Sequence, residues 1–354
     1  MESTEAQSTD PPTLPDSGPS DYEREREAVT KIAAARAKIR AELSKVIIGQ
    51  EEVIDEMLIA LLCGGHCLIT GAPGLAKTLL VKSLADLFHL SFQRIQFTPD
   101  LMPADITGTE ILSDTPDGGR AMEFQKGPVF ANMILADEIN RTPPKTQAAL
   151  LEAMQEHQVT AAGTSFPLEE PFFVLATQNP IEMEGTYPLP EAQLDRFMFN
   201  IVIDYLSEDD EVKVVTQTTG AGAGQIEALF TGEELLECHE VVRRVPVADD
   251  IVRYAVRLAA ASRPNRDGAS EFINNFVNWG AGLRAAQFLI LGGKTRALLE
   301  GRAHVTTDDV RTLAAPVLRH RILPNYRAEA EDVGVPEIIT HLLESVPAPL
   351  TGKA

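Results

Sequence analysis

The sequence predicts an α/β fold, in which a parallel five-stranded sheet with helices on both faces and β-hairpin inserts is followed by an all-helical domain. Two observations predict the sheet: short apolar runs alternate with helical segments, and a glycine-rich loop directly follows the first run. A third observation predicts the helical domain, because the strand pattern ends after Tyr205. Strands that alternate with helices form a parallel sheet covered on both faces.

Five apolar runs are interpreted as the buried strands of this sheet. Short runs of this kind, bounded by polar or glycine-rich segments, are typical of strands buried on both faces. They are Cys67–Thr70, Phe92–Phe97, Met133–Ala136, Phe172–Ala176 and Phe199–Ile203.

Two further pairs of short runs predict β-hairpins inserted between the strands and helices. Thr109–Leu112 and Met122–Gln125 flank Asp114-Thr-Pro-Asp-Gly-Gly119, which is a strong hairpin signal. Gln158–Ala161 and Ser165–Leu168 are joined by a short turn that contains glycine. Both hairpins are predicted to be additions to the sheet.

The glycine-rich loop has the form of a phosphate-binding loop. Gly71-Ala-Pro-Gly-Leu-Ala-Lys77-Thr78 lies between the first predicted strand and a helix, which is the context that this motif requires. Lys77 can reach the β- and γ-phosphates of a nucleotide, and the Thr78 hydroxyl is a magnesium ligand at a helix N-terminus. The usual motif has glycine where this chain has Ala76, and that glycine lets the backbone amides curl around the phosphates. The alternative is a glycine-rich turn without a ligand.

Polar residues end two of the predicted strands. Asp137 and Glu138 follow Met133–Ala136, and Asn179 ends the next strand. Open α/β sheets bind ligands at the carboxyl ends of their strands. Asp137 is expected to hold magnesium, largely through water, and Glu138 to polarise the attacking water as general base. A solvated strand end, and for Asn179 a turn cap, are the alternatives.

Together these motifs resemble those of the AAA+ ATPases, and in detail those of the MoxR family. The likeness spans residues 26–347 approximately. The segments that carry it are Gly71–Thr78, Ala136-Asp-Glu-Ile-Asn-Arg141, Ala176-Thr-Gln-Asn-Pro180 and Leu189-Pro-Glu-Ala-Gln-Leu-Asp-Arg-Phe197. MoxR-like loops share Gly-Leu-Ala-Lys, so Ala76 does not predict a loss of ATP binding.

The resemblance implies an AAA+ P-loop αβα core and a ring-forming, Mg²⁺- and ATP-dependent ATPase, expected to be a hexamer. It implies a chaperone-like motor that remodels a protein client, with a von Willebrand A-domain partner, in maturation or in cofactor or metal insertion. The predicted nucleotide contacts are Gly49, Gln50, Gly71, Ala72, Pro73, Gly74, Leu75, Ala76, Lys77, Thr78, Leu79 and Arg284. The predicted metal ligands are Thr78 and Asp137, and the predicted catalytic residues are Lys77, Glu138, Asn179, Arg196 and Arg284.

Three arginines receive roles from the resemblance. Arg196 lies in the Leu-Asp-Arg-Phe segment that resembles the arginine finger, so it would reach the γ-phosphate bound by the neighbouring subunit. A guanidinium there stabilises charge on the transferring phosphoryl group. Arg284 resembles the second sensor of the helical lid, although Gly282-Leu283 replaces the common Ser-Pro. Arg141 either faces the neighbouring site or is a surface residue at a helix start.

Four segments follow from these assignments. Residues 1–25, rich in Ser, Thr, Pro and Asp, are predicted to be a disordered acidic tail. Residues 26–207 form the predicted nucleotide-binding core. Residues 208–230, which include the Gly- and Ala-rich stretch Thr219–Gly224, are predicted to be a linker or flexible loop. Residues 231–350 form the predicted helical lid.

Composition restricts the class of protein. A chain of 354 residues that is 44% hydrophobic can bury the cores of two domains. The net charge of −21 repels polyanions, so no nucleic-acid partner is expected. No apolar run approaches the ~20 residues of a membrane span, and the N-terminus is polar and acidic, so the cytoplasm is predicted.

The cysteines predict neither disulfides nor zinc. Cys63, Cys67 and Cys238 are an odd number without framework spacing, which suits reduced thiols. His66 lies beside Cys67, but no second ligand pair accompanies this cluster.

Three alternative functions share some or all of these motifs: a nucleic-acid motor, a metal-chelatase motor subunit, and an inactive ATPase that serves as a binding platform. A nucleic-acid motor would place lysines or arginines on the hairpins, whereas Arg120 and Lys126 are the only basic residues on the first hairpin. The presence of Lys77, Asp137 and Glu138 argues against an inactive platform.

Overall fold

The structure is a computed structural model that describes residues 21–72, 74–114, 119–161, 163–179, 185–220 and 224–349. Several predictions fall outside these residues: most of the tail (1–20), Pro73 of the loop, the turn of the first hairpin (115–118), residue 162 of the second turn, Pro180, residues 221–223 of the linker, and residue 350. Helix α1 (Asp21–Leu43) begins at Asp21, inside the segment 1–25 that was predicted to be a disordered tail.

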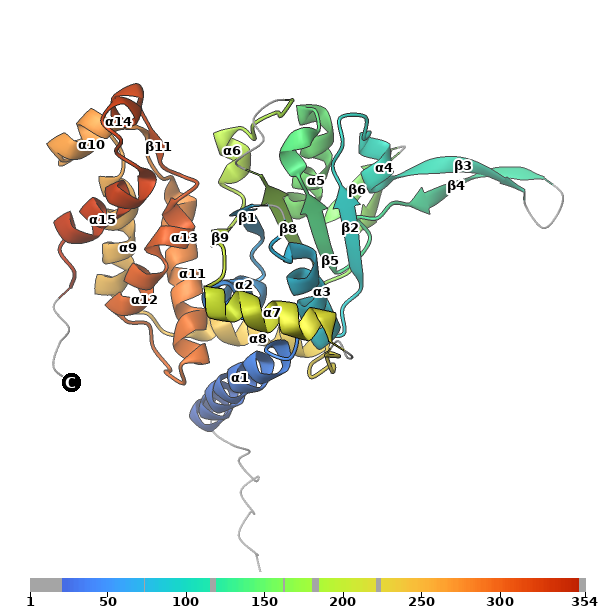
Figure 1. Cartoon of the computed structure of the whole chain (residues 1–354), viewed down its shortest axis with the longest axis horizontal. Coiled ribbons are helices and arrows are strands. Elements are labelled where there is room, and N and C mark those ends of the chain that lie inside the picture. The colour runs from blue at the N-terminus through green and yellow to red at the C-terminus, as the bar shows by residue number, and fades with distance from the viewer. Residues whose placement is uncertain are drawn as a thin grey trace, which may run out of the picture.

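Five parallel strands form the central sheet, in the order β2-β5-β8-β1-β9 (Figure 1). They are β1 (Cys67–Gly71), β2 (Phe92–Gln96), β5 (Met133–Asp137), β8 (Phe173–Gln178) and β9 (Phe199–Ile203). The predicted parallel five-stranded sheet is confirmed, because each of the five apolar runs forms one of these strands.

Helices cover both faces of the sheet, so its strands contribute to two cores. The helices of the core are α2 (Glu51–Cys63), α3 (Lys77–Leu87), α4 (Pro103–Thr107) and α5 (Pro144–Glu156). Alternate residues of one strand enter different cores: Leu135 packs with α2 and α3, whereas Ile134 packs with α5. The first core continues into the C-terminal helices, so the two parts of the chain share one apolar interior.

Both predicted hairpins are present. β3 (Gly108–Asp114) pairs with β4 (Arg120–Lys126), and β6 (Gln158–Ala161) pairs with β7 (Thr164–Pro167). The β3–β4 hairpin projects far from the body of the molecule (Figure 1). The rings of Phe124 and Phe166 stack at 4.2 Å between centroids, which joins the two hairpins at their bases.

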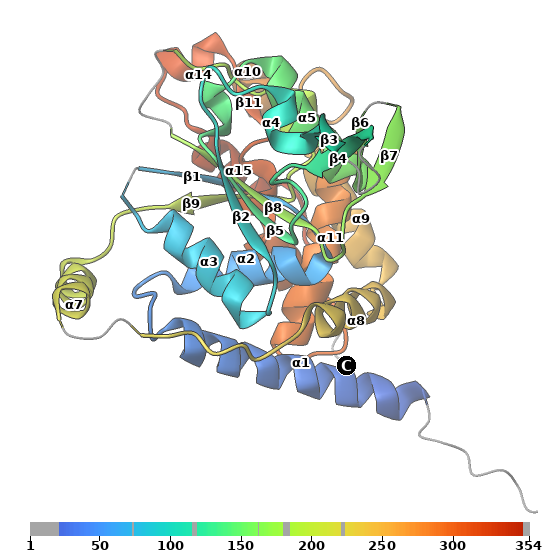
Figure 2. The same ribbon diagram turned by 90° about the vertical axis from the view of Figure 1, so that its right-hand side faces the viewer.

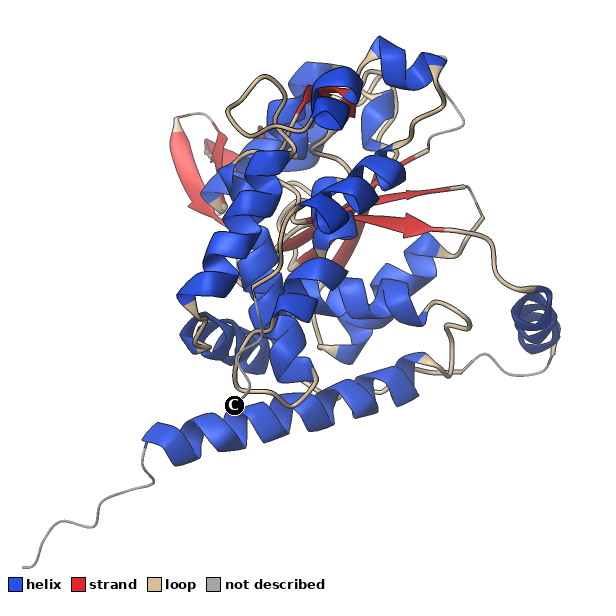
Figure 3. Cartoon of the chain, turned by 90° about the vertical axis from the view of Figure 1, so that its left-hand side faces the viewer, coloured by secondary structure: helices blue, strands red, loops and turns tan. Residues whose placement is uncertain are grey.

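The C-terminal part is helical apart from one short antiparallel strand pair (Figure 3). Its elements are α8 (Gly232–Arg244), α9 (Asp249–Ala261), α10 (Glu271–Phe276), β10 (Val277–Trp279), α11 (Leu283–Leu299), α12 (Thr307–Thr312), α13 (Ala314–Leu318), β11 (Leu323–Pro324), α14 (Tyr326–Ala330) and α15 (Val335–Ser345). Two short helices, η1 (Ile139–Arg141) and α6 (Glu191–Leu194), complete the core. No helix in the described part of the chain is both long and apolar enough to cross a bilayer.

The segment predicted as a linker contains a helix. α7 (Glu208–Thr219) begins where the Ser207 hydroxyl accepts a hydrogen bond from the backbone N–H of Asp210. Its first turn carries four acidic residues, which the positive end of the helix dipole favours. No residue of α7 is buried, and its apolar residues are three valines, Val212, Val214 and Val215. Figure 2 shows α7 standing apart from the body of the molecule.

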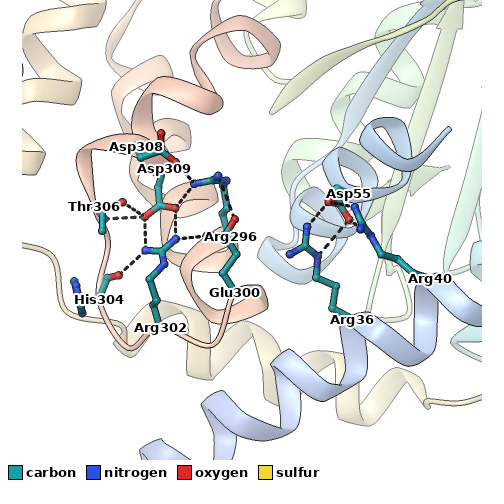
Figure 4. A network of polar contacts seen from close by, with 10 residues as sticks. All are labelled: Arg36, Arg40, Asp55, Arg296, Glu300, Arg302, His304, Thr306, Asp308 and Asp309. Carbon is teal, nitrogen blue, oxygen red and sulfur yellow. Dashed lines mark hydrogen bonds and ion pairs between the residues drawn. The ribbon is translucent and has the colours of Figure 1, made fainter. Parts of the chain in front are cut away.

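A buried carboxylate organises the turn between α11 and α12 (Figure 4). The side chain of Asp309 is fully buried and accepts hydrogen bonds from Arg302 (2.6 and 2.8 Å) and Arg296 (2.6 Å). It also accepts bonds from the backbone N–H and the hydroxyl of Thr306, which completes a capping box at the start of α12. Burial raises the pKa of Asp309, but these donors outweigh it and hold the pKa below the ordinary value of 3.8.

The Asp309→Ala variant is expected to lower the free energy of unfolding by about 3 kcal/mol, because it leaves two arginines without their buried partner. Urea unfolding followed by circular dichroism measures the loss. The matched control is Asp308→Ala, whose exposed carboxylate pairs with Arg296 alone and should contribute less than about 0.5 kcal/mol. Because the pKa of Asp309 is depressed in the folded state, its contribution should be complete above pH 3.8 and disappear on further acidification. Equal losses in the two variants would contradict the assignment.

Candidate functional site

The glycine-rich loop connects the end of β1 to the first residue of α3. Gly71 pairs with Ile203 of β9, and a Cβ on Gly71 would lie 2.4 Å from the Ile203 carbonyl oxygen, so a larger residue cannot fit. Gly74 has φ +84°, in the left-handed region that favours glycine. Ala76 also has a left-handed backbone, with φ 53° and ψ 25°, where it caps α3. The methyl group at this position is therefore accommodated in the backbone conformation that glycine adopts most easily.

A pocket of about 390 Å³ lies between this loop and the carboxyl ends of β5 and β8. Its lining residues are Gly74, Leu75, Ala76, Lys77, Thr78, Arg94, Asp137, Glu138, Thr177 and Asn179. The pocket thus brings together the lysine, the threonine, the two acids and the asparagine that the sequence indicates. Among the predicted contacts that the structure describes, Gly49, Gln50, Gly71, Ala72, Leu79 and Arg284 do not line it.

Lys77 lies half-buried at the start of α3. Its Nζ donates a hydrogen bond of 2.6 Å to the carbonyl oxygen of Gly71, which orients the side chain along the loop. Burial lowers the pKa of Lys77, and the carboxylates of Asp137 and Glu138 act in the opposite direction. An ammonium group in this position can bind phosphate oxygens that enter the pocket.

Thr177 of β8 fixes the acidic residues at the end of β5. Its hydroxyl donates to Asp137 Oδ1 at 2.6 Å and accepts from the backbone N–H of Glu138 at 2.8 Å. Arg94 of β2 donates to Asp137 Oδ2 through Nε (3.0 Å) and Nη2 (2.5 Å). The Asp137 carboxylate and the Thr78 hydroxyl line the same pocket, and such oxygen donors are the ligands that Mg²⁺ prefers. The residues present therefore fit a magnesium ion.

Glu138 turns the chain sharply as it leaves the sheet. Its backbone is left-handed, with φ 57° and ψ 48°, an unfavourable conformation that often occurs at functional residues. Its Oε2 accepts hydrogen bonds of 3.0 Å from Gln96 Nε2 and from Arg141 Nη1. Arg141 thus contacts the acid of its own chain, and its action on a neighbouring subunit stays a prediction.

Gly49 and Gln50 lie at the same edge of the sheet as the loop. The Gln50 amide donates to the carbonyl oxygen of Asp204, the residue after β9, at 3.4 Å. The preceding residue, Ile203, pairs with Gly71, so Gln50 is close to the start of the loop. Gly49 has φ +70°, and a Cβ there would lie 2.9 Å from Asp210 Oδ2 of α7.

Arg196 lies at the opposite edge of the sheet. It precedes β9, whereas the pocket lies beyond the carboxyl ends of the strands. Its Nη1 donates to the carbonyl oxygen of Leu151 in α5 at 2.8 Å, and its buried Nε has no hydrogen-bond partner in the described structure. Arg284 is near it, because its Nη1 lies 3.7 Å from Asp195 Oδ2.

A buried arginine holds this edge together. Arg321 Nε donates to Asp195 Oδ1 at 2.8 Å, and its other nitrogens donate to the carbonyl oxygens of Asp195, Phe197 and Met198. Burial lowers the pKa of Arg321 to about 10, while Asp195 opposes the shift, so the guanidinium stays charged at neutral pH. The lid is thereby attached to the segment that carries Arg196.

Comparison with known proteins identifies the family of the chain. The model of the ATPase family associated with various cellular activities (AAA) matches residues 66–199, and that of the AAA lid domain matches residues 273–342. Chaperone MoxR1 of Mycobacterium tuberculosis is 41% identical over 308 residues, which cover 87% of this chain and 81% of that protein. Protein MoxR of Paracoccus denitrificans is 31% identical over 87% of this chain and 95% of its own length. The chain belongs to the MoxR family of AAA ATPases.

A solved structure extends the likeness to the whole fold of this MoxR-family ATPase. A protein of Cytophaga hutchinsonii, described as a presumed ATPase, superposes with a TM-score of 0.85 at 41% identity. The match covers 92% of this chain and 98% of that one. The prediction of the family, the AAA core with its helical lid, and ATP hydrolysis as the enzymatic activity are confirmed.

Sequence analysis missed three residues of the MoxR-family site: Arg94, Gln96 and Thr177. All three act through partners on a neighbouring strand. Gln96 pairs in register with Asp137, so the contact with the acids depends on β2 lying beside β5. The polar residues of Phe92–Gln96, unusual in a buried strand, were the available signal. The roles assigned to individual site residues stay predictions.

The Ala76→Gly variant is expected to bind ATP as well as the wild type does and to be more stable by about 0.5 kcal/mol. The left-handed backbone costs alanine about 1 to 2 kcal/mol, and the greater entropy of glycine in the unfolded chain offsets part of that gain. Urea unfolding and calorimetric titration with ATP measure the two effects. Gly74→Ala, at φ +84°, is the reverse control and should destabilise the protein. A loss of stability in Ala76→Gly would refute this explanation of the loop.

Proposed function

We propose that this ATPase hydrolyses Mg-ATP within a ring, expected to be a hexamer, and uses the cycle to remodel a protein client. One observation carries the proposal. Lys77, Thr78, Asp137 and Glu138 line one pocket, whereas the predicted finger Arg196 lies at the far edge of the sheet. A complete site would therefore need a second subunit.

Within the pocket, each residue would have a distinct task. Lys77 would bind the β- and γ-phosphates, and Thr78 with Asp137 would hold Mg²⁺, which neutralises charge on the phosphates when bound. Glu138 would take a proton from the attacking water, and Asn179, just beyond β8, would orient that water. Gln96 and Arg141 hold the Glu138 carboxylate in place by hydrogen bonds to Oε2. These bonds fix the side chain that must accept the proton.

The position of Arg196 supports action on the neighbouring subunit. The five residues of β9 separate it from the carboxyl edge, a span of roughly 16 Å at 3.3 Å per residue. Arg284 contacts Asp195, so it lies at the same edge as Arg196. Both arginines would act on ATP held by the next subunit. A head-to-tail contact of this kind closes into a ring when the rotation between subunits allows it.

A protein client fits the exposed surface of the β3–β4 hairpin. Leu112 and Met122 pair across it and are more than half exposed. Exposed apolar residues on a projecting hairpin suit contact with polypeptide better than with phosphates. Two relatives are named MoxR and one is named a chaperone, which supports the same choice. A von Willebrand A-domain partner, a role in maturation or cofactor insertion, and a cytoplasmic location remain part of the proposal.

Glu138→Gln is expected to bind Mg-ATP but to hydrolyse it at least ~100-fold more slowly, because the amide cannot accept the proton. Steady-state phosphate release and ATP binding are measured on the same preparation. Lys77→Ala is the matched variant and should lose binding as well as hydrolysis. Undiminished turnover in Glu138→Gln would show that another group is the base.

Mixing two inactive variants tests the trans arrangement. Arg196→Ala retains an intact pocket and Glu138→Gln retains an intact finger, so mixed rings should regain activity. In a random equimolar mixture, about one quarter of the sites would combine an intact pocket with an intact neighbouring finger. Activity no greater than the sum of the separate variants would refute a finger supplied by the neighbour.

A further inference from the structure

A tryptophan and a leucine lie exposed on either side of the loop that leads to Arg284. Trp279 ends β10 with 64% of its surface exposed, and Leu283 begins α11 with 66% exposed. Trp279 is the only tryptophan in the chain. We call these two side chains, with Arg284, the Trp279 patch. Large apolar side chains exposed together commonly mark a contact surface.

The loop that presents the Trp279 patch is firmly anchored. A Cβ on Gly280 would lie 2.3 Å from the carbonyl oxygen of Ser262, so the backbone is pressed against the end of α9. The buried Ser262 hydroxyl accepts from the backbone N–H of Ala281 at 2.8 Å, and Arg263 Nε donates to the Ala281 carbonyl oxygen at 2.8 Å. The exposed side chains therefore project from a preorganised backbone, which lowers the entropy lost on binding.

The Trp279 patch is continuous with the edge that carries Arg196. Trp279 lines a hollow together with Asp195 and Arg321. Asp195 is the residue that Arg284 contacts, and it immediately precedes Arg196. Trp279 and Arg284 thus lie close to the acidic residue that precedes Arg196.

The opposite edge of the sheet carries a surface of complementary character. α7 follows β9 on the pocket side (Figure 2). It buries no residue, and Val212 and Val215 are 60% and 59% exposed. Its first turn is acidic throughout, from Glu208 to Glu211. The Trp279 patch combines apolar side chains with the half-exposed Arg284, whereas α7 combines apolar side chains with carboxylates. A head-to-tail contact joins two such different surfaces.

We propose that the Trp279 patch binds a second copy of this chain and buries Trp279 against the pocket-bearing edge of that copy. The inference rests on the proposed ring, since the patch adjoins the arginines that would act across it. It adds that apolar anchoring by Trp279 and Leu283, rather than the arginines alone, holds the next subunit. Central aromatic residues commonly contribute most to such interfaces.

The single tryptophan allows a direct test on the full-length chain. The Glu138→Gln protein with Mg-ATP is diluted through its assembly range, while sedimentation velocity gives the mass and tryptophan emission is recorded. With assembly, emission should move to shorter wavelength and acrylamide quenching should fall at least ~threefold, because interface cores exclude water.

Every other outcome overturns the inference, and the outcomes distinguish a wrong contact from a wrong ring. Assembly without a change in emission or quenching would leave the ring intact but place Trp279 outside the interface. A change in emission without a change in mass would show that the patch responds within one subunit. Failure to assemble at all would refute the proposed ring and, with it, this contact.

Variants supply an independent measurement. Trp279→Ala and Leu283→Ala should each weaken assembly at least ~tenfold, as truncation of an anchor residue does. The matched control is Leu112→Ala on the β3–β4 hairpin; this leucine is 58% exposed, against 66% for Leu283, and its truncation should leave assembly unchanged. Circular dichroism establishes that each variant is folded. If Trp279→Ala does not fold, the fluorescence of the intact chain still decides; if it folds and assembles normally, the proposal is wrong.

Discussion

The buried guanidinium of Arg321 is the interaction on which the relation between core and lid depends. It links the segment that follows α13 to Asp195, Phe197 and Met198, where the chain enters β9. Isolated charges are rarely buried, because desolvation costs several kcal/mol unless partners surround the group. Here a carboxylate and a set of carbonyl oxygens surround it. The same contact sets the position of Asp195, and with it the positions of Arg196 and Arg284.

The parallel sheet separates the chemical tasks of the molecule. Its carboxyl edge collects the loop, the acids and Asn179, while its amino edge carries the two arginines. The neighbouring strand β8 fixes the positions of the acids at the carboxyl edge, because the Thr177 hydroxyl bonds both to the carboxylate of Asp137 and to the backbone N–H of Glu138. The central strands β5 and β8 are buried almost throughout, so the polar groups at their carboxyl ends are held by a rigid framework rather than by mobile loops.

Much of the fold could be predicted because local patterns determine it. The apolar runs indicated the five strands, and the turn sequence of the first hairpin located its two strands within two residues. α7 escaped prediction because its apolar residues are only three valines, none of which is buried, and because a Gly- and Ala-rich stretch follows it directly. Its capping serine and acidic first turn were local signals that could have identified it.

The site residues that belong to contiguous sequence motifs could be predicted. Those that reach the site only because two strands lie side by side could not. Lys77, Asp137 and Glu138 belong to contiguous motifs, and the structure brings them together in one pocket. Arg94 and Gln96 reach the acids only because β2 lies next to β5, and no local sequence pattern predicts this strand order. The same holds for the placement of Arg284, since its distance from the pocket depends on how the lid is attached.

The hydrogen bond from Arg196 to Leu151 has a mechanical consequence. Leu151 lies in α5, which leads directly into β6, and the β6–β7 hairpin is stacked on the β3–β4 hairpin through Phe124 and Phe166. Arg196, the proposed finger, and both hairpins are therefore connected through α5. If Arg196 moved toward a phosphate, its hydrogen bond to Leu151 of α5 would break. Conversely, a force on the hairpins would be transmitted to α5, the helix that Arg196 contacts.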